Sequence, residues 1–214
     1  NTYTNPIFPL GGSEFVISAR FSLPYSLWNG IDYANLGDLE KYQDDDGNPD
    51  PAKIEQEKFR WLEFYKVKFK GSWYTRLFDK LVLRTNTEFG FLGAFNNDRG
   101  VIPFDRFFLG GDGMSQYAMD GRETISLRGY PNQSLSTQDG STIYNRFSLE
   151  LRYPITLKPA ASIFGLTFLE TGQGYNSFRE FNPFNGKRSL GLGLRIFMPA
   201  FGLLGIDFGY GLDA

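Results

Sequence analysis

Residues 144–154 read Tyr-Asn-Arg-Phe-Ser-Leu-Glu-Leu-Arg-Tyr-Pro, and from Arg146 to Tyr153 polar and apolar side chains alternate. The apolar face carries Phe147, Leu149, Leu151 and Tyr153, and the polar face carries Arg146, Ser148, Glu150 and Arg152. A period of two over about ten residues indicates a β-strand with one apolar and one polar face. A tilted strand of that length is long enough to cross a bilayer.

The same alternation recurs along the chain and predicts about seven strands. The alternating segments are residues 14–23, about 59–78, 81–95, 144–154, 161–171, 189–198 and 204–212. The second segment places Lys66, Lys68 and Lys70 together on its polar face, a basic stripe that either influences solutes or is simply hydrated. In the segment 161–171 both faces are largely apolar, with Phe168 and Glu170 on the face assigned to the interior.

The connections between these segments alternate in length. Short turns lie at residues 78–80, 158–159 and 199–202, and long loops lie at residues 25–58, 96–142 and 172–188. Outer-membrane barrels are built this way, with short periplasmic turns and long extracellular loops, whereas a soluble sandwich has no reason to sort its loops. The sequence therefore predicts an all-β fold, a transmembrane antiparallel β-barrel. A mean hydropathy of -0.32 agrees, because half of each strand would face a polar lumen.

About seven strands cannot close a barrel of this kind. Single-chain bacterial barrels have even strand numbers, and open sheet edges are not tolerated in hydrocarbon. We therefore expect residues 1–214 to form part of a longer barrel, with strands before and after them and no second domain. Because no leader sequence starts at Asn1, we expect either a mature chain or a piece of one.

The composition argues against several classes of function. Cysteine and histidine are both absent, which removes the commonest general base and the commonest ligands of transition metals. A net charge of -2 gives no support to nucleic-acid binding. The acidic run 44–50 lacks the glycine that a calcium loop needs at its sixth position, since Pro49 or Pro51 falls there. We expect a solvated loop, no enzyme activity, and no metal or cofactor.

A set of ordered motifs covers most of residues 104–212. Its members are Arg106-Phe107-x-x-Gly110-Gly111, Ser126-Leu127-Arg128-Gly129-Tyr130, residues 148–154, Phe168-Leu169-Glu170-Thr171-Gly172, and the stretch from Gly191 to Tyr210. The set resembles the loop-six region and the following strands of the Omp85 superfamily. One departure is Glu170, where the family more often has aspartate. In this resemblance the loop-six region is about 96–142.

The resemblance implies strands nine to fifteen of a sixteen-stranded outer-membrane barrel. Within the superfamily the motifs are most like those of members that fold and insert other barrel proteins. Unfolded outer-membrane β-barrel proteins, the lipid bilayer and accessory lipoproteins are then the expected partners, and nucleic acid is not. Two other functions remain open, namely a two-partner secretion translocator and the barrel of a patatin-like lipase fusion, which an upstream Gly-x-Ser-x-Gly would reveal.

The candidate functional residues are structural rather than catalytic. They are the loop-six motif Leu127, Arg128, Gly129 and Tyr130, together with Glu150, Phe168 and Glu170. The hypothesis is that Arg128 enters the lumen and pairs with the two inward-facing carboxylates. A cation–π contact with Phe168 would contribute on the order of 1 kcal/mol.

Overall fold

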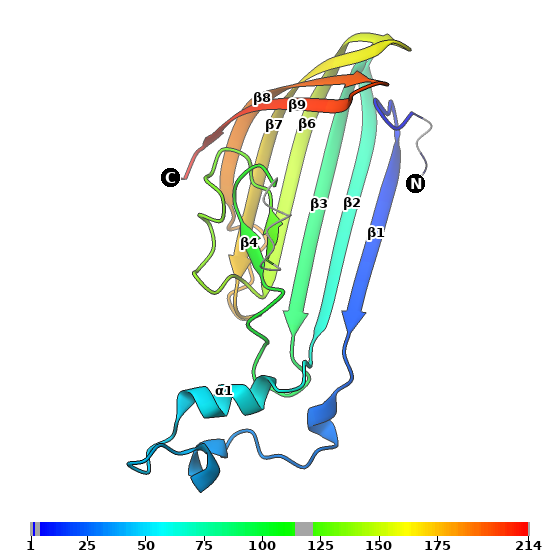
Figure 1. Ribbon diagram of the computed structural model, residues 1–214. Helices are drawn as coiled ribbons and strands as arrows, with labels where there is room; N and C mark the ends of the chain where they lie inside the picture. Colours follow the sequence, from blue (N-terminus) through cyan, green and yellow to red (C-terminus); the bar gives the residue numbers. More distant parts are fainter. Residues whose placement is uncertain (1, 3–4, 114–121, 214) are drawn as a thin grey trace.

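The computed structural model describes residues 2, 5–113 and 122–213, and it contains one large antiparallel sheet. The seven strands of this sheet are β1 Gly12–Phe21, β2 Tyr65–Phe78, β3 Leu81–Gly93, β6 Ile143–Lys158, β7 Ala161–Tyr175, β8 Lys187–Met198 and β9 Gly202–Gly211. Each strand pairs with the next one along the chain, so the sheet is an up-and-down meander (Figure 1). The predicted antiparallel barrel architecture is confirmed.

The sheet is curved, and its two faces have opposite chemistry. Polar side chains on the concave face are buried, among them Lys66, Glu150 and Glu170. Apolar side chains on the convex face are exposed, and Tyr153 and Ile155 of β6 are examples at 57% and 65%. This arrangement is the reverse of that in a soluble protein, and it suits a polar lumen surrounded by lipid.

Turns and loops lie at opposite ends of the strands (Figure 1). Residues 79–80, 159–160 and 199–201 form the short turns, and Asp79 has a positive φ of 24° in the first of them. The other end carries three longer connections, which we call loop five (22–64), loop six (94–142) and loop seven (176–186). The predicted sorting of connections by length is therefore observed.

The predicted start of the second strand, at about Phe59, is wrong. Residues Pro51–Phe59 form the helix α1, and the strand begins only at Tyr65. Asp50 caps the helix, since its carboxylate accepts hydrogen bonds from the backbone N–H groups of Ala52 and Lys53 at 2.9 and 3.3 Å. Pro51 stands at the first helical position, where its fixed φ favours a helix. No helix in the described residues is long and apolar enough to cross a membrane.

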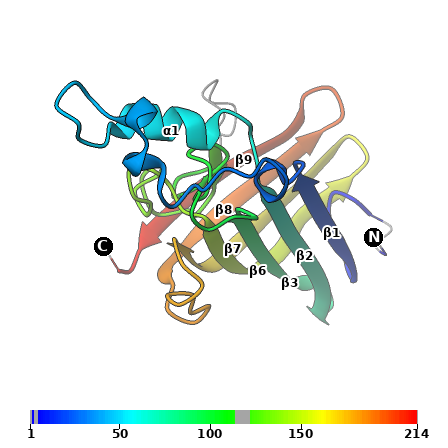
Figure 2. The same ribbon diagram turned by 90° about the horizontal axis from the view of Figure 1, so that it is seen from below.

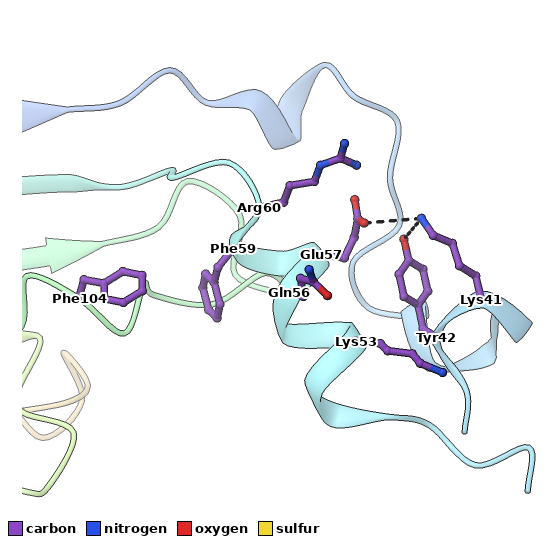
Figure 3. A pocket seen from close by; sticks show the side chains of 8 residues that line it. All are labelled: Lys41, Tyr42, Lys53, Gln56, Glu57, Phe59, Arg60 and Phe104. Atoms are coloured by element: carbon purple, nitrogen blue, oxygen red, sulfur yellow. Dashed lines mark hydrogen bonds and ion pairs between the residues drawn. The ribbon is translucent and has the colours of Figure 1, made fainter. Parts of the chain in front are cut away.

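Loop five is a folded unit rather than an open loop. Three short 3-10 helices precede α1, namely η1 Tyr25–Leu27, η2 Leu36–Asp38 and η3 Glu40–Tyr42. Tyr33, Leu36 and Tyr42 form a small apolar core against Ile54 of α1. A cleft of about 640 Å³ opens beside α1, and in it Lys41 is bonded to the Tyr42 hydroxyl and lies 3.7 Å from Glu57 (Figure 3).

The acidic run 44–50 lies in a closed turn of loop five. The Asp44 carboxylate accepts hydrogen bonds from the backbone N–H groups of Asn48 and Asp46, at 2.8 and 3.0 Å. The bond from Asn48 is the main cause that holds the pKa of Asp44 below its ordinary value. Within the described residues, no group of three or more aspartates or glutamates is placed to hold a metal ion.

A buried ion pair ties loop five to the start of loop six. Arg99 and Glu63 are 2% and 1% exposed, and their side chains are 2.9 Å apart. Glu63 also accepts hydrogen bonds from the backbone N–H and the hydroxyl of Ser26 at 2.7 and 2.6 Å. Arg99 donates to the carbonyls of Lys58 and Trp61. Arg99 therefore contacts the end of α1 and the segment that leads into β2.

We predict that Glu63→Gln releases loop five. The substitution leaves Arg99 buried without a compensating charge, which costs about 3 kcal/mol. Trypsin added to the folded barrel should then cleave within residues 22–64 faster than in the unsubstituted protein. Mass spectrometry of the released peptides measures the cleavage rate. The control is Glu55→Gln, a change at an exposed position of α1, which should leave the cleavage rate unchanged. Equal rates for the two variants would contradict the role given to the ion pair.

Candidate functional site

Loop six lies against the concave face of the sheet, that is, in the lumen (Figures 1 and 2). Two short strands within it, β4 Phe107–Leu109 and β5 Glu123–Ile125, pair in parallel. Their apolar side chains pack with Leu92 of β3 and Tyr144 of β6 in a buried cluster. The loop therefore has a core of its own that is shared with the barrel wall.

The basic stripe on β2 holds this part of loop six in place. The Lys66 ammonium is 2.7 Å from Glu123 and 3.3 Å from Asp105, and it lies 4.5 Å from the centre of the Phe107 ring. Lys68 is 2.6 Å from Glu123. Burial acts against ionisation of Glu123, but its hydrogen bonds to Lys66 and Lys68 hold the pKa of this carboxyl below its ordinary value. Two of the three lysines thus bind the loop.

The tip of loop six, which we define as residues 127–130, reaches the middle strands of the sheet through Arg128. Its guanidinium donates to Glu170 from Nε at 3.0 Å and from Nη2 at 2.5 Å, and to Glu150 from Nη2 at 2.8 Å. The backbone N–H of Arg128 also donates to Glu170 at 3.0 Å. The Phe168 ring lies under the guanidinium, with its centre 3.7 Å away. The structure thus brings together four of the residues that the sequence singled out.

The two glutamates also bind other cations, so Arg128 joins a continuous network. Glu170 is 2.7 Å from Arg146, and Glu150 is 2.5 Å from Arg152. The charged groups connected in this way are Lys70, Arg84, Glu88, Arg128, Arg146, Glu150, Arg152, Glu170, Arg195 and Asp207. Both carboxylates at Arg128 are shielded from solvent, with exposures of 4% for Glu150 and 1% for Glu170. Charge pairs in such surroundings are stronger than exposed ones.

Asp207 on β9 is a third carboxylate at Arg128, which we did not predict as a partner. Its Oδ2 atom accepts a hydrogen bond from Arg128 Nη1 at 3.3 Å, and Arg195 of β8 binds both Asp207 oxygens at 2.7 Å. The alternation of β9 carried a signal for it, because Asp207 is the charged residue on a face that otherwise carries Leu203 and glycines. Those glycines are Gly205, Gly209 and Gly211.

Gly129 allows the tip to approach the backbone of β9. Its φ of 93° lies in a region that other residues avoid. A Cβ atom at this position would lie 2.8 Å from the carbonyl carbon of Tyr210. On the strand itself, a Cβ at Gly209 would lie 2.8 Å from the Gly129 nitrogen, and one at Gly211 would lie 2.9 Å from the Tyr130 ring. Glycine is therefore needed on both sides of the contact.

Leu127 and Tyr130 fix the two sides of the tip. Leu127 is fully buried, and its N–H donates to the carbonyl of Gly111 at 3.1 Å. The Tyr130 hydroxyl donates to the carbonyl of Arg188 on β8 at 2.8 Å and accepts a hydrogen bond from the Asp213 N–H at 3.2 Å. All four residues of the motif thus contact the lumen wall or the base of the loop.

Comparison with known proteins identifies the class that this fold and site define. The family model of the Omp85 superfamily domain matches residues 5–214, so the chain belongs to the Omp85 superfamily, and its sheet is part of a bacterial outer-membrane β-barrel. Among solved structures, it is similar to BamA from Haemophilus ducreyi lacking POTRA domains 1-3, with a TM-score of 0.65 and 20% sequence identity. That match covers 100% of this chain but only 37% of the BamA chain. No curated protein matches the sequence.

We predict that Arg128→Ala destabilises the folded barrel. Its loss leaves Glu150, Glu170 and Asp207 close together with less compensating charge, which costs about 3 kcal/mol. The change in the free energy of unfolding is measured by urea unfolding in lipid vesicles, and heat-modifiable gel mobility reports the folded fraction. The control is Arg60→Ala at an exposed position of loop five, which should change stability by less than about 0.5 kcal/mol. A similar effect of both substitutions would remove the special role of Arg128.

We also predict that Gly129→Ala displaces the tip of loop six. The methyl group would meet the Tyr210 backbone, and the positive φ adds strain, so a loss of about 2–3 kcal/mol is expected. Gly100→Ala is a matched control, because Gly100 has a similar φ of 83° but no atom within 4 Å of the added group. The control isolates the backbone strain, about 1 kcal/mol. Equal losses in the same unfolding assay would show that the contact with β9 is unimportant.

Proposed function

We propose that the chain is the C-terminal part of the barrel of an outer-membrane protein assembly factor. In this proposal residues 1–214 supply strands nine to fifteen of a sixteen-stranded, BamA-type barrel. The whole protein folds and inserts other β-barrel proteins as the core of a BAM-type complex. Its partners are unfolded barrel proteins, the lipid bilayer and accessory lipoproteins. It acts without a cofactor and is not an enzyme.

The observation that carries this proposal is the locked position of loop six. Three sets of contacts hold the loop in the lumen: Arg99 with loop five, Glu123 with the lysines of β2, and Arg128 with β6, β7 and β9. Five charged residues of the lumen wall bind the loop, as expected of a scaffold rather than of a wide solute channel; they are Lys66, Lys68, Glu150, Glu170 and Asp207. The Omp85 family match and the fold of BamA agree with such a role.

The contact between loop six and β9 suggests how the loop serves assembly. In the proposed strand count, β9 lies one strand from the seam between the first and last strands. An unpaired strand edge at such a seam can template an incoming strand by β-augmentation. Because Gly129 packs on Tyr210 and Arg128 binds Asp207, the loop would fix the position of β9, the neighbour of the last strand at the seam. The loop would then keep the templating edge in a defined place.

Depletion of the full-length parent protein in its own host tests the function. The proposal predicts a broad loss of β-barrel proteins from the outer membrane, measured by quantitative proteomics. Loss of one secreted protein, with the barrel proteins intact, would instead identify a dedicated translocator of the two-partner secretion type. Loss of a lipase activity alone would identify the barrel of a patatin-like fusion.

A further inference from the structure

Loop seven folds over the convex, lipid-facing side of the sheet, unlike loop six. The ring of Phe178 stacks on that of Phe91, with centres 5.7 Å apart and planes 9° apart. Phe181 lies 6.1 Å from Phe91 and 5.4 Å from Tyr175. Phe91 faces outward, because its neighbour Leu92 is buried in the core shared with loop six. The chain between β7 and β8 therefore returns along the outside of the barrel wall.

Polar contacts hold the loop on this surface. Asn145 also faces outward, yet it is fully buried, and its amide donates to the carbonyl of Pro183 at 3.2 Å. The Tyr175 hydroxyl donates to the carbonyl of Asn182. A Cβ at Gly186 would lie 3.0 Å from the backbone nitrogen of Gly172, so the end of the loop packs closely on β7. Loop seven thus covers polar groups that would otherwise face hydrocarbon.

The outer side of loop seven presents two largely exposed aromatic side chains. Phe184 is 95% exposed and Phe178 is 64% exposed. A tight turn projects Phe184, since its N–H donates to the Asn182 side chain at 3.1 Å and the Asn185 N–H donates to the Asn182 carbonyl at 3.1 Å. Transferring one phenyl side chain from water to an apolar medium is worth about 2 kcal/mol. The nearby Arg179 is exposed as well.

We propose that loop seven is an anchor in the outer leaflet of the membrane. Phe178 and Phe184 insert at the boundary between headgroups and acyl chains, and Arg179 meets the phosphate groups of the lipids. Loop seven is continuous with the lipid-facing wall, which supports lipid as its partner. Phe89 and Phe147 form an outward-facing pair beside the loop, with ring centres 5.5 Å apart. Aromatic and basic side chains are those found where a protein meets the membrane interface.

The test uses the full-length parent protein in vesicles of phosphatidylcholine and phosphatidylglycerol. An environment-sensitive NBD dye is attached to a Phe184→Cys variant, with any cysteines elsewhere in the parent replaced. The matched control is Phe104→Cys, another exposed phenylalanine (59%), which lies in loop six beside the cleft at the mouth (Figure 3). Doxyl-labelled lipid reports contact with the bilayer, and aqueous iodide reports contact with water.

The proposal predicts that doxyl lipid quenches the dye at position 184 at least about twofold more than at position 104, and that iodide shows the opposite order. Equal iodide quenching at the two positions would place loop seven in water and overturn the proposal. Protection of position 184 from both quenchers would show that another protein surface covers the loop, which also overturns it. A Phe178→Cys variant repeats the measurement if the first variant fails to assemble.

Discussion

A largely buried guanidinium lies between carboxylates of three strands in the interior of this barrel. Arg128 reaches Glu150 on β6, Glu170 on β7 and Asp207 on β9, with nitrogen–oxygen distances between 2.5 and 3.3 Å. Carboxylates brought this close repel one another unless cations lie between them, and desolvation makes an unpaired one costly. The loop that carries Arg128 is therefore part of the electrostatic balance of the wall, and wall and loop stabilise each other.

The second constraint is steric, and it acts through glycine. Gly129 and Gly209 let the backbones of loop six and β9 approach so closely that a Cβ atom at either position would clash with the other segment. The polar side of the barrel thus combines a charged anchor with a glycine surface that receives it. On the outside the same strands are apolar, and loop seven adds Phe178 and Phe184 to that surface. Loop six thus presents a charged residue and a glycine to the polar face, and loop seven presents aromatic residues on the apolar face.

Alternation predicted most of the wall, because a period of two is imposed by strand geometry and read directly from residues such as Leu149 and Glu150. It failed at residues 59–64, where apolar spacing resembled a strand, although Asp50 and Pro51 carried a helix-capping signal. It also could not place the loops. Whether a loop enters the lumen or lies outside depends on contacts such as that of Asn145 with Pro183, which are distant in sequence.

The coupling between Arg128 and Glu170 is the most direct measure of the central claim. A double-mutant cycle with Arg128→Ala and Glu170→Gln, measured by urea unfolding in lipid vesicles, isolates their interaction. If the pair docks loop six, the double variant should lose less stability than the sum of the two single losses, by about 1–3 kcal/mol. Additive losses would mean that the two groups act independently, and the contact at 2.5 Å would not be what holds the loop in the lumen.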